Sequence, residues 1–382
     1  MKPIEFKTTP HILSEIGATE RIGQMMASKG CTHVAFITDQ GILDLGLADQ
    51  ALKGLDDAGV RVWTFSQVVA DPPEAMILEA VEAARAQGVD GVVSVGGGSS
   101  LDTAKLIAML LGTDQPISEM YGVNLVKGER LPLVLAPTTA GTGSEVTPIA
   151  IVTTGENEKK GVVAPQLLPD SAVLDASLTT GLPAHVTAAT GIDAMVHAIE
   201  AYTSKRLKNV ISDTLAKQAL TLLGANIRTA CTEPDNLDAR ADMLLGSMLA
   251  GMAFTNAPVA AVHALAYPLG GHFHIPHGHS NALVLPYVME FNMPAARDLY
   301  DELAPIIFPD LSGSKSPAEG MVEAFKALGP ELGMQSKLSE LGIGHNHLPK
   351  LAEDAMKQER LLINNPREMT YEAALEIYQK AL

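Results

Sequence analysis

Five of the eleven histidines lie in one short stretch, where they could bind a metal ion or carry protons. The stretch covers residues 262–281 and reads VHALAYPLGGHFHIPHGHSN. Its first histidine lies on an alanine-rich helix that we expect to break at Pro268, and a later one lies in a Pro-His-Gly turn. Spacing alone leaves open which of them bind a metal. The five are His263, His272, His274, His277 and His279.

Asp193 and His197 form a second group with metal-binding side chains. They are four residues apart in a helical pattern, so both project from one face of the expected helix. Two ligands from this helix and two from the histidine stretch would make a four-ligand site. One carboxylate and three imidazoles, without a thiolate, suit Fe(II) or Zn(II) with positions open for substrate. The alternative is an exposed pair that stabilises the helix.

A glycine-rich loop, GGGSS at residues 96–100, follows one expected strand and opens the next expected helix. Glycines let a ligand approach the main chain, and the free N–H groups of a helix start favour a phosphate. The loop matches neither GxGxxG nor a P-loop. The alternative is a tight turn in which Ser99 or Ser100 caps the helix.

A second loop, PTTAGTGSEVT at residues 137–147, follows another expected strand. Two such loops at the carboxyl ends of strands describe the ligand crevice of an open α/β sheet, and together they predict a nucleotide site. Asp39 ends an earlier strand. Its carboxylate could accept hydrogen bonds from ribose hydroxyls and repel a 2′-phosphate, with a helix N-cap as the alternative.

The elements that must position these residues differ between the two halves of the chain. In the first half, β-rich runs alternate with helical patterns, which indicates a mostly parallel sheet. The expected strands are 34–38, 60–65, 91–95, 131–136, 149–153, 161–164 and 172–174, and the expected helices are 43–58, 74–87 and 101–111.

Long helical patterns dominate the chain after Leu182 and Pro183. We therefore expect an α/β domain over residues 1–182 and an all-helical domain over residues 183–382. Within the second domain, 308–317 reads as a surface loop. The expected helices are 188–204, 211–230, 237–254 and several more beyond Pro294.

Length and composition exclude several classes of protein. A chain of 382 residues with 47% hydrophobic and 19% charged residues is long enough for two domains with large cores. Its net charge of −17 argues against a nucleic-acid or anionic-membrane surface. Two cysteines cannot form a disulfide framework. With a polar start and no long apolar run, we expect a cytoplasmic protein with no membrane partner.

Four motifs together resemble the iron-containing (group III) alcohol dehydrogenase family, which includes lactaldehyde reductase and 1,3-propanediol dehydrogenase. They are GGGSSLDTAK at 96–105, PTTAGTGSEVT at 137–147, GIDAMVHAIEAYTS at 191–204, and the run from 263 to 292. The resemblance covers nearly the whole chain. It implies a dehydroquinate synthase-like fold, with an α/β dinucleotide-binding domain followed by an all-α metal-binding domain.

The resemblance also implies roles for individual residues. The family's metal ligands fall on Asp193, His197, His263 and His277. Its cofactor-binding positions fall on Asp39, Gly97, Gly98, Ser99, Thr138, Thr139 and Lys160. Two positions depart from the family pattern: Asp71 stands where Asn often precedes Pro, and Tyr267 stands where many members carry a histidine near substrate.

The implied function is a metal-dependent, NAD(H)-linked oxidation of a small primary alcohol, diol or hydroxyacid, or the reverse reduction. His272 and His274 are candidates for the proton relay, with His279 as another, and Tyr267 is expected to line the substrate pocket. A homodimer or larger homo-oligomer is expected. The main alternative is a hydroxyacid–oxoacid transhydrogenase with a tightly bound nicotinamide cofactor, because a tyrosine also precedes the proline in that branch. A dehydroquinate synthase-like lyase fits less well, because its metal site typically has Glu in place of the first Asp.

Overall fold

The computed structural model describes residues 4–155 and 158–382. These residues form two compact units. An α/β unit contains residues 7–139, 143–155 and 158–180, and a helical unit contains residues 4–6, 140–142 and 181–382. The loop at 140–142 thus belongs with the helical unit although it lies far upstream in the chain. The division of the chain at residue 182 stays a prediction.

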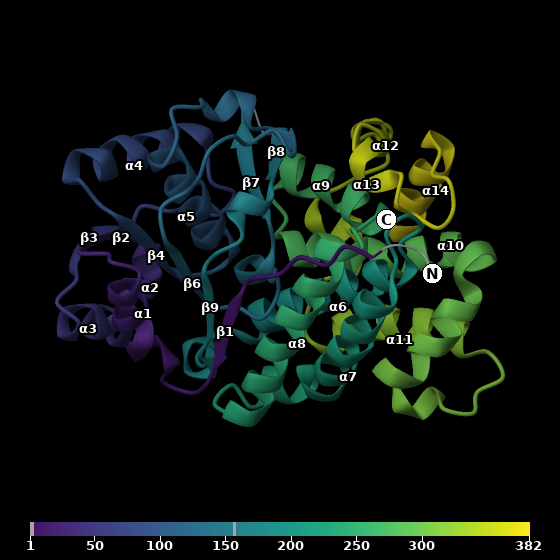
Figure 1. The fold of residues 1–382 in the computed structure, drawn as a ribbon. Helices are drawn as coiled ribbons and strands as arrows, with labels where there is room; N and C mark the ends of the chain where they lie inside the picture. The colour runs from purple at the N-terminus through teal and green to yellow at the C-terminus, as the bar shows by residue number, and fades with distance from the viewer. Residues whose placement is uncertain (1–3, 156–157) are drawn as a thin grey trace. The chain divides into compact units, whose positions relative to one another are not determined.

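A six-stranded parallel sheet forms the centre of the α/β unit, which confirms the expected fold class (Figure 1). Parallel strands need crossover connections, and the alternation of strands and helices in the sequence supplies them. In spatial order the strands are β1 (His11–Ser14), β9 (Ser171–Leu174), β6 (Leu133–Pro137), β4 (Gly91–Gly96), β2 (His33–Ile37) and β3 (Arg61–Phe65). β1 was not expected from the sequence.

Helices cover both faces of this sheet. Successive strand residues point to opposite sides, so each face presents apolar side chains that pack against its own layer of helices. Val92 packs into one core together with α4 and α5, whereas Val93 packs into another with α1 and α3. Strands buried on both faces therefore read as continuous apolar runs. The helices are α1 (Ile22–Ser28), α2 (Gln40–Asp44), α3 (Asp49–Asp57), α4 (Glu74–Gln87) and α5 (Gly98–Leu111).

The order of the strands creates a switch point between β2 and β4. From β2 the chain moves outward to β3, then returns to the other side of β2 at β4 and continues outward to β6. Ligands of open α/β sheets bind outside the carboxyl ends of the strands at such a point. The loops after β2 and β4 contain Asp39 and Gly97, so the topology places both at the edge where a dinucleotide would bind.

Two expectations for this unit need correction. The single helix expected at 43–58 is two helices, α2 and α3, because Gly46 between them has a φ of 69°. The expected strand at 161–164 begins earlier, as β8 (Glu158–Val163). β8 lies between β5 (Gly122–Val123) and β7 (Ile149–Thr154) in a separate three-stranded sheet.

The helical unit contains two long helices that run through prolines. The expected break at Pro268 is wrong, because α9 continues to Phe273. The several helices expected beyond Pro294 are present. Pro294 itself lies inside a helix, since α10 spans 31 residues through Pro286, Pro294 and Pro305. Each proline removes one backbone hydrogen bond, and the extensive burial of both helices offsets that loss.

The helices of this unit begin and end as follows: α6 (Ala184–Thr203), α7 (Val210–Thr232), α8 (Leu237–Asn256), α9 (Ala261–Phe273), α10 (His277–Ile307), α11 (Pro317–Glu331), α12 (Leu348–Met356), α13 (Glu359–Leu362) and α14 (Tyr371–Ala381). Within the described ranges, no helix taken alone has the length and hydropathy of a membrane span. The pair α8 and α9 meets those criteria together, but it is bent by 108°.

Candidate functional site

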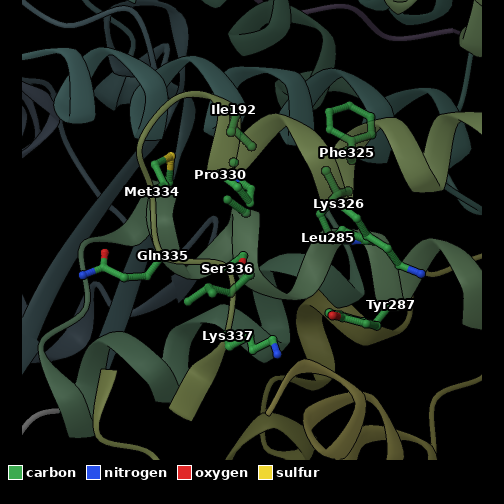
Figure 2. Close-up of a pocket in the computed structure, with 14 residues that line it drawn as sticks. Ile192, Leu285, Tyr287, Phe325, Lys326, Pro330, Met334, Gln335, Ser336 and Lys337 are labelled. Atoms are coloured by element: carbon green, nitrogen blue, oxygen red, sulfur yellow. The ribbon is translucent and has the colours of Figure 1, made fainter. Parts of the chain in front are cut away.

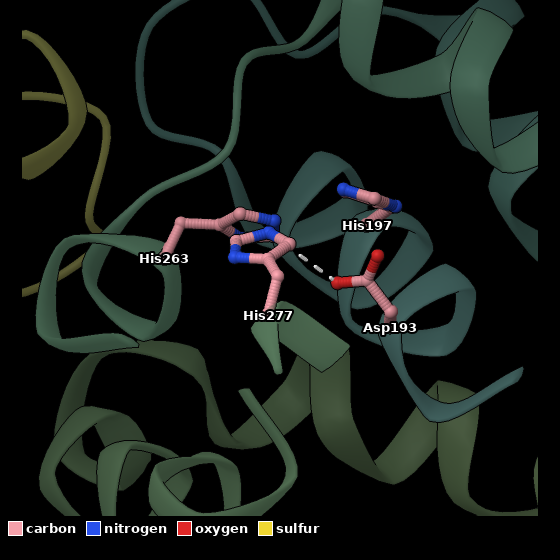
Figure 3. Close-up of side chains that lie close together, drawn as sticks. All are labelled: Asp193, His197, His263 and His277. Atoms are coloured by element: carbon pink, nitrogen blue, oxygen red, sulfur yellow. Dashed lines mark ion pairs between the residues drawn. The ribbon is translucent and has the colours of Figure 1, made fainter. Parts of the chain in front are cut away.

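Four side chains from three helices meet at one point in the helical unit (Figure 3). Asp193 and His197 lie on α6, His263 lies on α9, and His277 is the first residue of α10. One ligand atom of each lies within 4.8 Å of the others. The turn expected around His277 is instead a helix start. Of the five histidines left open by spacing, the structure brings only two to this point.

Gly278 permits the start of α10 to approach α6. A Cβ atom at this position would lie 2.2 Å from the carbonyl oxygen of Ala189 and 3.1 Å from the Cβ of Asp193. The first contact is far shorter than van der Waals distance and involves backbone that cannot move aside. The glycine therefore lets His277 come within reach of Asp193, with 3.6 Å between Nε2 and Oδ1.

Glu200 orients the His263 ring. Its Oε2 atom accepts a hydrogen bond of 2.7 Å from His263 Nδ1, and the same carboxylate accepts backbone bonds from Ala260 and Val262 at the start of α9. Because a carboxylate oxygen accepts, Nδ1 carries the proton and Nε2 keeps its lone pair for a metal. Sequence reasoning missed Glu200, although it lies three residues after His197 in the expected helix.

His197 is oriented by a backbone carbonyl. Its Nδ1 donates to the oxygen of Gly141 over 3.2 Å, and its ring stacks on Phe254 at 4.4 Å between centres. Burial lowers the pKa of His197 to about 4. The imidazole is therefore neutral near pH 7, which is the form that binds metals.

Asp193 is buried and held by an amide. Burial opposes the charge of its carboxylate, but the surrounding imidazoles and the Asn281 amide favour it, so its pKa lies below the ordinary value of 3.8. Asn281 Nδ2 donates to Asp193 Oδ1 over 2.6 Å. The same amide nitrogen lies 3.3 Å from His277 Nε2 and 3.5 Å from His263 Nε2. Both of those nitrogens thus face the space beside Asp193.

The donor set fits one divalent cation. An anionic oxygen and three neutral imidazole nitrogens are the ligands that Fe(II) and Zn(II) accept, with bonds of about 2.0–2.2 Å. Within the part of the chain that the structure describes, the Asn281 Oδ1 atom is buried without a hydrogen-bond partner. A buried hydrogen-bond acceptor without a partner costs free energy in an ordinary protein core. Its presence next to four clustered metal-ligand side chains therefore fits a metal site.

The remaining histidines lie outside this group of four. His272 Nε2 donates to Asp354 Oδ2 of α12 over 2.7 Å, and His279 Nε2 donates to the Gln335 carbonyl. His274 ends α9 with a φ of 54° and is exposed. Tyr267 does lie beside the group, with its ring centre 5.8 Å from that of His277. The proton-relay roles of His272 and His274 stay predictions.

The two glycine-containing loops are adjacent at the carboxyl edge of the sheet. Thr138 N donates to Gly96 O over 3.0 Å, and Thr139 lies 3.9 Å from where a Gly97 Cβ would be. Gly97 is the N-cap of α5 and caps it without a side-chain bond, so the serine cap considered above is not formed. Backbone N–H groups of this helix start, at Gly98 and Ser99, can therefore serve an anion.

Asp39 takes the helix-cap position in the structure. Its carboxylate accepts a bond of 3.1 Å from Ile42 N at the start of α2. A Cβ atom on Gly96 would lie 4.0 Å from Asp39 Oδ2. Capping uses one carboxylate oxygen, and the other points to the glycine loop, so both roles considered from the sequence are compatible.

The side chains of Lys159 and Lys160, which are neighbours on β8, point to opposite sides of the strand. Lys160 Nζ lies 5.7 Å from the centre of the Tyr121 ring and 3.3 Å from Glu158. Lys159 instead forms a 2.7 Å ion pair with Asp71, in the loop after β3. Because neighbouring strand residues face opposite sides, Lys159 rather than Lys160 contacts that loop. A cofactor role for Lys160 stays a prediction.

Lys105 links the helix of the first loop to the end of the second. Its buried ammonium donates to Ser144 Oγ at 2.7 Å, Thr147 Oγ1 at 3.1 Å and Ile149 O at 2.7 Å. Burial lowers its pKa, which the nearby Asp102 opposes. Sequence reasoning missed this residue, which the motif GGGSSLDTAK contains at its end.

A cavity of about 210 Å³ lies elsewhere in the helical unit (Figure 2). Ile192 of α6, Phe325 of α11 and Met334 contribute apolar surface, and Lys326 and Lys337 contribute charge. None of the residues assigned from the sequence lines it. The cavity is therefore separate from the group of four metal-binding side chains.

Comparison with known proteins gives consistent matches over nearly the whole chain. The protein-family model described as iron-containing alcohol dehydrogenase matches residues 9–176. A second family model, described as Fe-containing alcohol dehydrogenase family, C-terminal, matches residues 187–382. Long-chain-alcohol dehydrogenase 1 of Geobacillus thermodenitrificans is 40% identical over 375 residues, covering 96% of this chain and 93% of the relative.

Solved structures of alcohol dehydrogenases and related reductases are similar to this chain over its full length. The crystal structure of a 1,3-propanediol oxidoreductase superposes with a TM-score of 0.96 at 32% identity, covering 100% of both chains. Sulfoacetaldehyde reductase from Bifidobacterium kashiwanohense, solved in complex with NAD+, has a TM-score of 0.90 at 28% identity and covers 100% of this chain and 99% of that one.

We predict that His277→Ala abolishes metal retention while the fold survives. The side chain is 31% exposed at the first residue of α10, so its removal costs little packing but deletes one of four donors. Metal content by inductively coupled plasma mass spectrometry, with circular dichroism for the fold, measures both. His185→Ala, at an exposed position of α6, is the matched control. A His277→Ala protein with full metal content would contradict the assignment.

Proposed function

Because this chain belongs to the iron-containing alcohol dehydrogenase family and is an oxidoreductase acting on alcohols, we propose that it transfers hydride between NAD and a small primary alcohol, diol or hydroxyacid. The observation that carries the proposal is the convergence of four metal-binding side chains from three helices within 4.8 Å. A group of this composition is suited to polarising a single oxygen atom.

We assign Asp193, His197, His263 and His277 as the ligands of one divalent ion, Fe(II), with Zn(II) as the alternative. When bound, the ion would supply Lewis acidity toward the alcohol or carbonyl oxygen, and NAD would supply the hydride acceptor or donor. Glu200 and Gly141 keep two of the imidazoles in the tautomer that presents Nε2. Asn281 holds the Asp193 carboxylate in place.

The α/β unit is assigned to cofactor binding. The N–H groups at Gly97, Gly98 and Ser99 would hold the pyrophosphate, as helix starts do in other dinucleotide sites. Asp39 would accept bonds from the adenosine ribose. Thr138 and Thr139 are assigned to the nicotinamide half, and the hydrogen bond from Thr138 to Gly96 supports their place beside the pyrophosphate loop.

The proposal is tested by the absorbance of NADH at 340 nm with a panel of primary alcohols, diols and hydroxyacids. We expect reduction of added NAD by at least one class, and loss of that activity after chelation with recovery on adding Fe(II) or Zn(II). Enzyme loaded with metal that binds NAD but oxidises none of the panel would contradict the proposal.

The transhydrogenase reaction is the second candidate, and the tyrosine at position 267 favours it. In that reaction a hydroxyacid reduces an oxoacid through cofactor that stays bound. The two reactions differ in their need for free NAD. Hydroxyacid-to-oxoacid exchange that proceeds without added NAD, together with no NADH release, would favour this candidate.

We also expect a homodimer or larger homo-oligomer in the cytoplasm.

We predict a preference for NAD over NADP, which Asp39→Gly relaxes. The Asp39 carboxylate would repel a 2′-phosphate, so removing it should raise kcat/KM for NADP. Glycine is a suitable replacement because it costs a helix N-cap only a few tenths of a kcal/mol. Asp44→Asn, an exposed charge on the same helix, is the control. Equal kcat/KM for the two cofactors in the wild type would contradict the role of Asp39.

We predict that Tyr267→Phe changes KM or substrate preference and lowers kcat by less than about tenfold. A phenol with a pKa near 10 is a poor base at neutral pH, and loss of a general base typically costs about 10²–10⁴-fold. Steady-state kinetics measures the change, with Tyr371→Phe, at an exposed position of α14, as the control. A fall in kcat of a hundredfold or more, at unchanged metal content, would make Tyr267 the proton relay.

A further inference from the structure

The segment Ala140–Thr142 contacts the helix that carries two proposed metal ligands. It follows directly on Thr138 and Thr139, yet it groups with the helical unit rather than with the α/β unit. Two independent observations define its contact with α6. One is a hydrogen bond to His197, and the other is close packing against Thr190.

The hydrogen bond determines which nitrogen of His197 is available. A carbonyl oxygen can only accept, so the 3.2 Å bond between Gly141 O and His197 Nδ1 requires the proton on Nδ1. Nε2 then keeps the lone pair that a metal needs. Hydrogen-bond partners of this kind fix the orientation of metal-binding histidines, and their loss typically costs 10–100-fold in metal affinity.

The packing holds that carbonyl in one place. A Cβ atom on Gly141 would lie 2.8 Å from Thr190 Cβ and 3.2 Å from both Thr190 Cα and Thr190 O. Thr190 precedes Asp193 by three residues and His197 by seven, so all three lie along one side of α6. The loop therefore cannot move along this helix without moving the hydrogen bond to His197.

We propose that Gly141 is a positioning residue that couples cofactor binding to metal binding, so that NAD and the metal ion bind cooperatively. The inference rests on the proposed function, in which Thr138 and Thr139 hold the nicotinamide half. Dinucleotide binding there orders the chain two residues before Gly141, which favours the conformation in which its carbonyl holds His197. Thermodynamic linkage requires the metal ion to favour NAD binding by the same factor.

The wild-type enzyme provides the first test, with Zn(II) as the metal probe. NAD affinity is measured by isothermal titration calorimetry on chelator-stripped and Zn(II)-loaded enzyme, and Zn(II) affinity by competition with a chromophoric chelator with and without NAD. We expect each ligand to tighten the other by at least about fivefold, the lower end of typical coupling. Independent binding of the two ligands would overturn the inference and leave the proposed function intact.

Gly141→Ala provides the second test, because its methyl group must push the loop away from Thr190. We expect a Zn(II) Kd raised about 10–100-fold and a coupling factor that falls toward one. Gly329→Ala is the matched control, since a Cβ there meets nothing within 4 Å. Coupling that persists at the wild-type factor in Gly141→Ala would show that the ligands communicate directly, and would overturn the role of Gly141.

Ala140→Gly keeps the second test informative if Gly141→Ala does not fold. It loosens the chain between Thr139 and Gly141 without adding bulk, and glycine increases the conformations that binding must restrict. We expect the coupling factor to fall by at least about twofold while circular dichroism and the melting temperature stay close to wild type. An unchanged coupling factor would count against the inference. Wild-type enzyme that binds neither ligand would overturn the proposed function and this inference together.

Discussion

The buried carboxylate of Glu200 is the interaction on which the metal-binding helices depend. It accepts three hydrogen bonds at 2.7–2.9 Å, two from the backbone at the start of α9 and one from His263. Hydrogen bonds to a charged group contribute about 1.5–3 kcal/mol each, so one side chain both caps α9 and joins it to α6. The direction of the His263 ring follows from that cap, because the same Oε2 atom that accepts from Ala260 at the start of the helix also accepts from Nδ1.

Close backbone approach is the second constraint, and glycines make it possible. Gly278 lets α10 pack against the backbone of α6 near Ala189, and Gly141 lets a loop pack against Thr190 on the same helix. Rigid helices in contact at such short range hold their side chains within narrow limits, which metal coordination requires. All four metal-binding side chains thus lie on helices, and the Gly141 carbonyl that orients His197 comes from a loop.

The α/β unit has a different role, because its helix starts can present backbone N–H groups to an anion. The parallel sheet brings the loops after β2, β4 and β6 to one edge, and the bond between Thr138 and Gly96 joins two of them. The fully buried ammonium of Lys105 then joins α5 to Ser144 in the second loop and to Ile149 just after it. A buried charge with several hydrogen bonds is costly to move, so it keeps these segments in one arrangement.

The alternation of strands and helices, the two glycine loops and the pairing of Asp193 with His197 were all predictable from local pattern, because each depends on residues close in the chain. Motif resemblance assigned His263 and His277 among five histidines, which spacing had left open. Contacts between distant segments instead explain why α9 continues through Pro268, how Glu200 and Gly141 orient the imidazoles, and why His272 and His279 form hydrogen bonds elsewhere. The physical reason is that distances between helices depend on how their surfaces pack, and no local periodicity encodes that packing.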